Sequence, residues 1–228
     1  MKPRPTLKYF IAFAALLFTM HELHEIAHTS VGRLICGCWG QRDFNVWELC
    51  RGCSEGSHLG LLATLAGPVF TFGMIWWGYR LLGNQDIGYQ SLGFSLIFAN
   101  MPIGRLLSAI LNSGDETYML RSLGMERNAA AIAASVLIFL IIFIPLRKAY
   151  LALGGKQKII WFLGFLVLPL IFDLLIVLGL LNTLLNRGIL DNYWILGSPM
   201  IVSLWTFFVL SLLWLKRKAL FNFFDTVP

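Results

Sequence analysis

Six apolar stretches, each about as long as a bilayer is thick, make up most of the 228-residue chain. An α-helix crosses the hydrocarbon core with ~20 residues. In lipid every backbone polar group must be bonded within the protein, so stretches of this length fold as helices. We therefore expect an all-α fold, a polytopic membrane helical bundle of about six transmembrane helices that forms one integral-membrane domain over residues 1–228. The stretches cover residues 8–34, 58–82, 88–111, 128–146, 158–185 and 194–215.

The composition supports this interpretation, because 57% of the residues are hydrophobic and only 13% are charged. Soluble domains carry about 25% charged residues. The balance excludes an ordinary soluble enzyme, a disordered chain and a small secreted disulfide protein. The net charge is +6, but most Lys and Arg stand in short runs beside apolar stretches. Such charges set membrane orientation and favour anionic head groups, so the expected partner is the lipid bilayer, with no nucleic acid.

The distribution of basic residues predicts an orientation for the bundle. Six spans would place both chain ends on one side, which carries 11 Lys and Arg against 6 on the other. The positive-inside rule then predicts cytoplasmic termini, with loops 36–57 and 112–127 outside. We expect a multi-pass protein of the cell membrane. Because no small-residue cleavage site follows the basic, apolar N-terminus, we interpret that segment as a retained first span and not as a leader.

Ionisable residues are concentrated in the first apolar stretch, where His21, Glu22, His24, Glu25 and His28 fall within eight residues. A charged group at the centre of a bilayer costs roughly 2.5–3.5 kcal/mol on insertion scales, so such groups usually face a bundle interior, a partner or an ion. At helical spacing, His21 and the H-E-x-x-H residues share a sector about 100° wide. This polar face is therefore expected to lie inside the bundle.

Residues His24 to His28 read H-E-x-x-H, a pattern with a specific chemical meaning. Two His at i and i+4 lie one turn apart on one helix face and can bind one Zn²⁺. The intervening Glu25 can then take a proton from a water on the metal and pass it to a leaving amine. His21, one turn earlier, is either a supporting group or a substitute ligand. The alternatives to zinc hydrolysis are a metal or proton pathway and a purely structural polar face.

The sequence resembles the site-2 protease family of intramembrane zinc metalloproteases over about residues 20–116. His24-Glu25-x-x-His28 matches the first motif of that family in full, and Ala66-Gly67-Pro68 is similar to its Gly-Pro element, which helps to shape the substrate site. Asn100-Met101-Pro102 is similar to the Asn and Pro that precede the third ligand of the family. The resemblance implies Zn²⁺ as cofactor and a membrane-embedded protein as substrate, with Asn100 positioned to orient that substrate or polarise its carbonyl.

The third ligand of the family is an Asp, usually within Leu-Asp-Gly, and this sequence contains no Leu-Asp-Gly. Asp115 is the preferred candidate by sequence order, provided that the third apolar stretch is kinked near Pro102 or begins deeper in the membrane. Asp173 is the alternative, because its depth within the fifth stretch is closer to that of the histidines. Arg105, inside the third stretch, is expected to pair with Asp115 or Glu116, or to extend to the interface.

All four cysteines fall in the loop 36–57, at Cys36, Cys38, Cys50 and Cys53. In an oxidising compartment they would form two disulfides. In the cytoplasm four thiolates could hold a structural zinc instead, or the thiols could remain unpaired. The orientation predicted from the basic residues favours disulfides, whereas the resemblance favours a cytoplasmic loop, so the sequence leaves these alternatives open.

Together these patterns predict an intramembrane zinc metalloprotease that hydrolyses peptide bonds of membrane-anchored substrates. His24, His28 and Asp115, or Asp173 in its place, would bind Zn²⁺, and Glu25 would be the catalytic acid and base. Two other functions remain open. One is a membrane metal-ion or proton transporter, and the other is a non-catalytic relative that binds membrane segments without cutting them.

Overall fold

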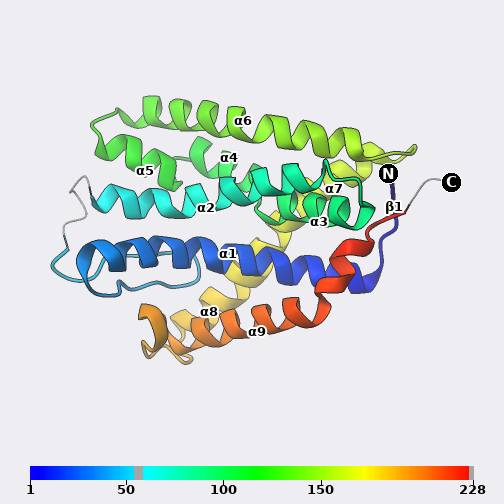
Figure 1. Cartoon of the computed structure of the whole chain (residues 1–228). Helices are drawn as coiled ribbons and strands as arrows, with labels where there is room; N and C mark the ends of the chain where they lie inside the picture. Colours follow the sequence, from blue (N-terminus) through cyan, green and yellow to red (C-terminus); the bar gives the residue numbers. More distant parts are fainter. Residues whose placement is uncertain (54–58, 226–228) are drawn as a thin grey trace.

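The computed structural model describes residues 1–53 and 59–225, and these contain six helical spans long and apolar enough to cross a membrane. The predicted all-α bundle is confirmed, and each predicted stretch corresponds to one span (Figure 1). Residue 58, the expected start of the second stretch, and residues 54–57 of the predicted loop lie outside the described residues. The spans cover Leu7–Cys36, Gly60–Leu81, Ile87–Ile110, Arg127–Ala152, Lys158–Asn186 and Met200–Asn222.

Helix α1 (Leu7–Cys36) forms the centre of the bundle and packs against α2 (Gly60–Leu81) and α9 (Met200–Lys216). Its start is fixed by Thr6, whose side chain accepts a hydrogen bond from the backbone N–H of Tyr9. Ser and Thr favour this position because they satisfy one of the unpaired N–H groups of the first turn. The helix ends at Gly37, which adopts the left-handed conformation that glycine tolerates at helix ends.

The third span is broken into α3 (Ile87–Ala99) and α4 (Pro102–Ile110). Met101 has a positive φ of 46°, and Pro102 begins α4, where its missing N–H needs no partner. A short turn after α4 leads into α5 (Asp115–Ser122), which packs against α2 and α6 (Arg127–Ala152). A kink near Pro102 was required for Asp115 to come close to the histidines, and the break between α3 and α4 lies at that position.

Two predicted boundaries are wrong. The fourth stretch was expected to end at residue 146, but α6 continues through Pro145 to Ala152. A proline inside a membrane helix removes one backbone hydrogen bond, and packed neighbours make that loss tolerable. The sixth was expected to start at residue 194, but Ile195–Gly197 form a single 3-10 turn and α9 begins at Met200. Gly, Ser and Pro at 197–199 favour a turn more strongly than hydropathy indicates.

The fifth span consists of α7 (Lys158–Phe172), a π-helical segment η1 (Asp173–Leu181) and α8 (Asn182–Asn186). Figure 1 shows this span running obliquely past α1. It is among the least enclosed spans, and its outer face is apolar. It therefore forms one wall of the bundle that faces lipid.

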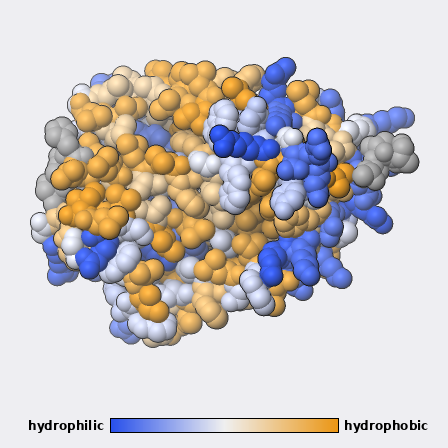
Figure 2. Space-filling view, viewed as in Figure 1, coloured by the Kyte–Doolittle hydropathy of each residue, from blue (hydrophilic) through white to orange (hydrophobic). Residues whose placement is uncertain are grey.

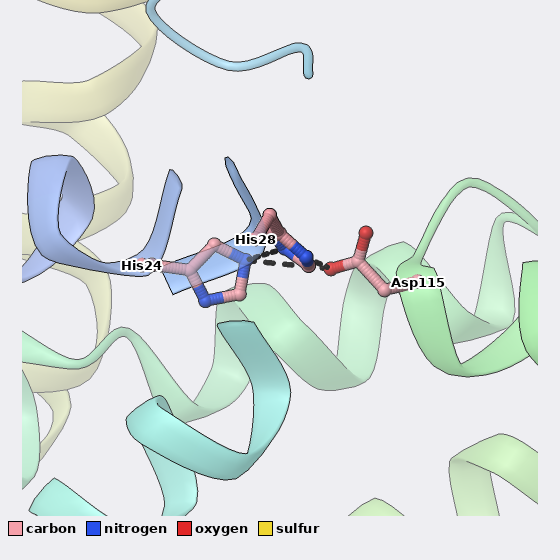
Figure 3. Close-up of side chains that lie close together, drawn as sticks. All are labelled: His24, His28 and Asp115. Atoms are coloured by element: carbon pink, nitrogen blue, oxygen red, sulfur yellow. Dashed lines mark hydrogen bonds and ion pairs between the residues drawn. The ribbon is translucent and has the colours of Figure 1, made fainter. Parts of the chain in front are cut away.

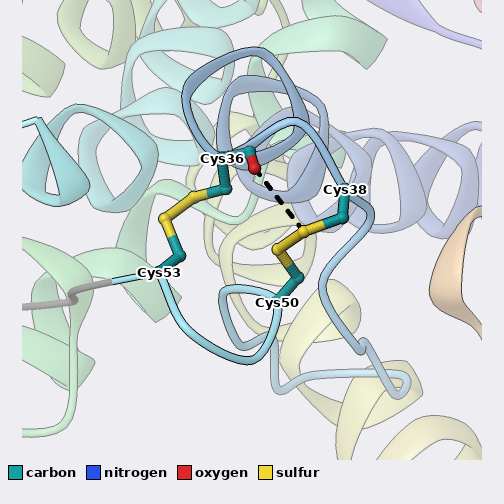
Figure 4. Close-up of a disulfide and its surroundings, with 4 residues drawn as sticks. All are labelled: Cys36, Cys38, Cys50 and Cys53. Carbon is teal, nitrogen blue, oxygen red and sulfur yellow. Dashed lines mark hydrogen bonds between the residues drawn. A yellow bond between two sulfur atoms is a disulfide. The ribbon is translucent and has the colours of Figure 1, made fainter.

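The segment between α1 and α2 does not lie on the surface as a simple outward loop. Residues 37–53, called here the re-entrant loop, fold back along the bundle, and Arg42 forms an isolated antiparallel bridge with Trp47. Phe44, between them, is fully buried in the main apolar core. Disulfides Cys36–Cys53 and Cys38–Cys50 close the two ends of the loop, as Figure 4 shows. The loop is thus cross-linked at its base and inserted at its middle.

The two ends of the chain meet at the opposite end of the bundle. Strand β1 (Lys2–Pro3) pairs antiparallel with β2 (Phe224–Asp225), and both termini lie on that side in Figure 1. Beneath them Phe223 stacks on Tyr9 and contacts Phe94 and Phe165. Figure 2 shows hydrophilic residues gathered at this end, next to a largely hydrophobic flank.

Candidate metal centre

His24 and His28 on α1 and Asp115 at the start of α5 bring three potential ligand atoms together (Figure 3). The two Nε2 atoms are 3.1 Å apart. Oδ2 of Asp115 lies 3.3 Å from Nε2 of His24 and 3.6 Å from Nε2 of His28. His28 is fully buried and His24 nearly so. The site therefore lies inside the protein, within the length of the first membrane span.

The second nitrogen of each imidazole is held by α2. Nδ1 of His28 lies 2.7 Å from the carbonyl oxygen of Ala63, and Nδ1 of His24 lies 2.8 Å from Oγ1 of Thr71. A carbonyl oxygen can only accept, so Nδ1 of His28 donates this bond, and Nε2 is the ring nitrogen left to face a metal. The hydroxyl oxygen of Thr71 can likewise accept a hydrogen bond from Nδ1 of His24. Metal-ligating histidines are oriented in this way, with the other ring N–H donated to a nearby oxygen.

The spacing of the three atoms fits a small tetrahedral cation. Zinc bonds of ~2.0–2.2 Å in tetrahedral geometry place neighbouring ligand atoms about 3.3–3.6 Å apart. The three distances, 3.1, 3.3 and 3.6 Å, fall on or close to that range. Two imidazole nitrogens and a carboxylate oxygen are also donor types that zinc accepts. The residues present therefore suit Zn²⁺ in both donor type and spacing.

Gly67 of α2 provides the space next to these atoms. A Cβ atom at this position would overlap Nε2 of His28 and would lie 2.6–2.7 Å from Cε1 and Nε2 of His24. Pro68 follows it inside α2 and is buried. The Gly-Pro element singled out in the sequence thus borders the imidazoles directly.

Asp115 is held by a cation from the neighbouring helix. Nη2 of Arg105, on α4, lies 2.9 Å from Oδ2 of Asp115 and 2.8 Å from both carboxylate oxygens of Glu116. The pairing expected for Arg105 is present with both acids. Because Arg105 follows the break at Met101 by one turn of helix, α4 and α5 together carry the third ligand atom to α1.

A cavity of about 590 Å³ opens beside the centre, between α1, α4 and the oblique fifth span. Glu25 and Asn100 both line it and are 5% exposed. Oε2 of Glu25 and Oδ1 of Asn100 are buried without a hydrogen-bond partner in the described chain, whereas Nδ2 of Asn100 donates to the carbonyl of Leu96 at 2.7 Å. Unpaired buried oxygens are costly, and polar cavities usually supply them with water or a ligand.

Asp173 and His21 lie elsewhere in the same cavity. Oδ1 of Asp173 is 3.1 Å from Nδ1 of His21, which links η1 to α1. Within the described residues, the group able to share a metal contains Asp115 and not Asp173 or His21. The structure therefore places Asp115, the preferred candidate, next to His24 and His28, and places Asp173, the alternative, next to His21.

Three contributors to this site escaped the sequence analysis. Trp47 of the re-entrant loop stacks on His28, with ring centroids 4.6 Å apart and planes 8° from parallel. Thr71 and the carbonyl of Ala63 hold the imidazoles. Thr71 follows Gly67 by four residues on α2, a spacing that places both on one face. The position of Trp47 has no comparable signal, because it depends on how the loop folds back.

A second cavity, of about 350 Å³, shares Trp47 and Asp115 with the first and is also lined by Glu48, Thr64 and Tyr118. It lies at the end of the bundle that carries the re-entrant loop. Burial and the charge of Glu48 raise the pKa of Asp43, another acid of that loop. The centre thus has a cavity on each side, and polar groups take a larger share of the wall in the smaller one.

Comparison of the chain with protein-family models, curated proteins and solved structures finds no match.

Proposed function

We propose that this protein is an intramembrane zinc metalloprotease that hydrolyses peptide bonds of membrane-anchored substrates. The observation that carries the proposal is the convergence of two imidazole nitrogens and one carboxylate oxygen at tetrahedral spacing, inside a bundle of apolar spans. The unpaired carboxylate oxygen of Glu25 borders the same cavity. The resemblance of His24-Glu25-x-x-His28 to the site-2 protease motif supports the same chemistry.

In this proposal His24, His28 and Asp115 hold Zn²⁺, which when bound supplies Lewis acidity for peptide hydrolysis. Glu25 takes the proton of the attacking water and returns it to the leaving nitrogen. Its buried, unpaired oxygen is free for that exchange. Asn100 uses Nδ2 for Leu96, so its free Oδ1 is an acceptor for a substrate backbone N–H. The second N–H of Nδ2 remains a donor for a substrate carbonyl, so Asn100 has both an acceptor and a donor for the substrate backbone.

The substrate class follows from the walls of the larger cavity. Leu170, Leu174 and Leu178, on the fifth span, line it opposite α4. Such walls favour an apolar segment, as in a membrane-anchored protein. A helix shields its peptide bonds by internal hydrogen bonding, so the segment must enter unwound. The unpaired side-chain oxygen Oδ1 of Asn100 can then accept a hydrogen bond from one of the exposed backbone N–H groups of the segment.

We further propose that the re-entrant loop faces an oxidising compartment and that the termini are cytoplasmic. Two disulfides at the base of the loop are stable in such a compartment and rare in the cytosol. The excess of basic residues at the other end supports the same orientation. In a cell membrane, the metal centre would then lie nearer the outer face.

Transport of a metal ion or a proton is less well supported. That function would use Glu22 and Asp173 along a path through the bundle, but Glu22 is buried in an ion pair with Arg42 at 2.9 Å. Asp173 is paired with His21. Glu22 is thus already engaged by a cation, and the described contact of Asp173 is with His21 on the same side of the cavity.

The proposal is tested with purified full-length protein and a fluorogenic peptide anchored in vesicles. Glu25→Gln should leave about one zinc per chain, because Glu25 is not among the ligand atoms, and should abolish cleavage. Cleavage retained by Glu25→Gln, or a folded wild-type protein that binds no zinc, would refute the mechanism. Zinc flux into vesicles that persists in Glu25→Gln would favour transport instead.

A further inference from the structure

An apolar groove of about 370 Å³ lies on the outer side of the bundle. None of the residues that line it takes part in the proposed reaction. It is formed where α4, α6 and α7 meet, and its volume is within the range of ligand sites, ~300–1,000 Å³. Apolar side chains make up nearly all of its wall. The residues that line it are Ile103, Leu106, Phe139, Ile142, Phe143, Leu146, Arg147, Tyr150, Phe162 and Leu166.

One end of the groove carries the positive charge of Arg147, which is unpaired among the described residues. Arg147 is exposed and has no ion-pair or hydrogen-bond partner in the described part of the chain. Its basic neighbours are engaged: Lys148 donates to the carbonyl of Tyr79 at 2.9 Å, and the Nζ of Lys158 lies 4.4 Å from the centre of the Tyr150 ring. Tyr150, three residues after Arg147 on the same helix, also lines the groove. The groove is therefore apolar along its length and cationic at one end.

The charged end lies where lipid head groups would be. Arg147 is five residues before the end of α6, and Gly154 just beyond that end donates its N–H to the carbonyl of Met1 at 2.7 Å. This is the basic end of the bundle, at which Figure 2 shows the hydrophilic residues. Basic pockets between transmembrane helices on the cytoplasmic side are typical binding places for anionic lipid head groups.

We propose that this groove binds an anionic glycerophospholipid, with one acyl chain along α4, α6 and α7 and the phosphate at Arg147. The complementarity of both parts carries the assignment, because a zwitterionic lipid would fill the groove equally well but would gain less from an unpaired guanidinium. Arg147 can bind a phosphate through two parallel N–H bonds, and the hydroxyl of Tyr150 is available as a further donor.

The groove shares a helix with the metal centre. Ile103 and Leu106 line the groove from α4, while Gly104 and Arg105 on the same helix line the cavity of the metal centre. An acyl chain in the groove would thus pack against the back of the helix that holds Asp115 through Arg105. The lipid proposal itself stands on the groove and its charge and does not depend on proteolysis.

The test is a lipid titration of the purified full-length protein in detergent, followed by native mass spectrometry. Phosphatidylglycerol and phosphatidylcholine with identical palmitoyl and oleoyl chains differ only in the head group. Phosphatidylglycerol should bind about fivefold more tightly, the effect of about one basic residue. Arg147→Gln should reduce its affinity to that of phosphatidylcholine, and Ile103→Trp, which fills the groove, should weaken both lipids.

Lys156→Gln is the matched control, because it removes an exposed positive charge at the same end but outside the groove. It should leave the preference for phosphatidylglycerol unchanged. Equal binding of the two lipids to the wild-type protein would overturn the proposal. So would a loss in Lys156→Gln as large as that in Arg147→Gln, since the preference would then be a diffuse surface effect. Arg147 is exposed, so its substitution tests the proposal even if Ile103→Trp does not fold.

Discussion

Asp115 and Asp173 are distinguished as ligands by the histidines that each one contacts. Asp115 lies 3.3 Å from His24 and 3.6 Å from His28, whereas Asp173 lies 3.1 Å from His21. Asp115→Asn should therefore reduce zinc content well below one per chain, while Asp173→Asn should leave it unchanged. Metal analysis of the two purified proteins, with monodispersity checked by gel filtration, measures the difference. The opposite pattern would assign the third ligand to Asp173.

The absence of a side chain at Gly67 leaves room for the two imidazoles of the metal centre. Gly67→Ala would place a methyl group against Nε2 of His28 and His24, so we expect loss of zinc and of cleavage with the fold retained. Gly73→Ala on the same helix is the control, because a Cβ there meets nothing within 4 Å. It should behave like the wild type in metal analysis and in the cleavage assay. A Gly67→Ala protein with full zinc content would show that the metal is not held between these imidazoles.

Sequence spacing could place His24, Glu25 and His28 on one helix face, because i and i+4 positions in one helix need no tertiary information. It could not place Thr71 or the carbonyl of Ala63 beside them. Those contacts depend on how α2 rotates against α1, which hydropathy does not determine. The resemblance supplied Gly67 as a candidate, but the reason for glycine became clear only from the two imidazoles next to it.

At the scale of elements, the break between α3 and α4 decides where Asp115 lies. Hydropathy indicates one continuous stretch over 88–111, and only Asn100-Met101-Pro102 suggests an interruption. Pro102 disfavours the α-helical conformation for the residue before it, and Met101 takes a positive φ. The direction of the helix after such a break cannot be derived from sequence. From the sequence, Asp115 could therefore be proposed as a ligand only on the condition that the third stretch is kinked or begins deeper in the membrane.

The fold of the re-entrant loop is the part of the structure for which the sequence analysis made no prediction beyond its cysteines and its side of the membrane. An Arg42 in a loop between spans is expected to be solvated, but it is 2% exposed and paired with Glu22, which is 3% exposed. Thr206 on α9 donates to the same carboxylate at 2.6 Å. Glu22 was counted among the ionisable residues of the first span, and its partner comes from a loop 20 residues away. Local patterns do not reveal a pairing of this kind.

This ion pair should anchor the loop to α1. Arg42→Met leaves Glu22 charged and buried, which costs about 3–5 kcal/mol when one partner of a buried pair is removed. We expect a large drop in Tm in detergent, and a partial recovery in the Arg42→Met, Glu22→Gln double variant, where no unpaired charge remains. Arg51→Met, an exposed change in the same loop, is the control. An equal drop in Arg51→Met, or no recovery in the double variant, would contradict the anchoring role.

At the scale of the whole molecule, the two ends of the bundle differ in chemistry. One end carries both disulfides and the smaller cavity next to Asp115, and the other carries the two terminal strands and most of the basic residues. The disulfides and the charges thus support one orientation by independent physical arguments, redox environment and charge bias. The sequence alone left these arguments in conflict with the resemblance, because it did not establish that the cysteines pair.

The orientation is testable because all four cysteines are in disulfides. Without reductant, the wild-type protein should not react with a membrane-impermeant maleimide. Labelling of a variant with one added cysteine therefore shows on which side of the membrane that cysteine lies. Lys156→Cys, at the end with the termini, should be labelled only after cells are permeabilised. Arg187→Cys follows α8, which Asn182 links to Asn45 of the re-entrant loop. It should be labelled in intact cells. The reverse pattern would place the metal centre near the cytoplasmic face and the two disulfides in a reducing compartment, where they would not persist.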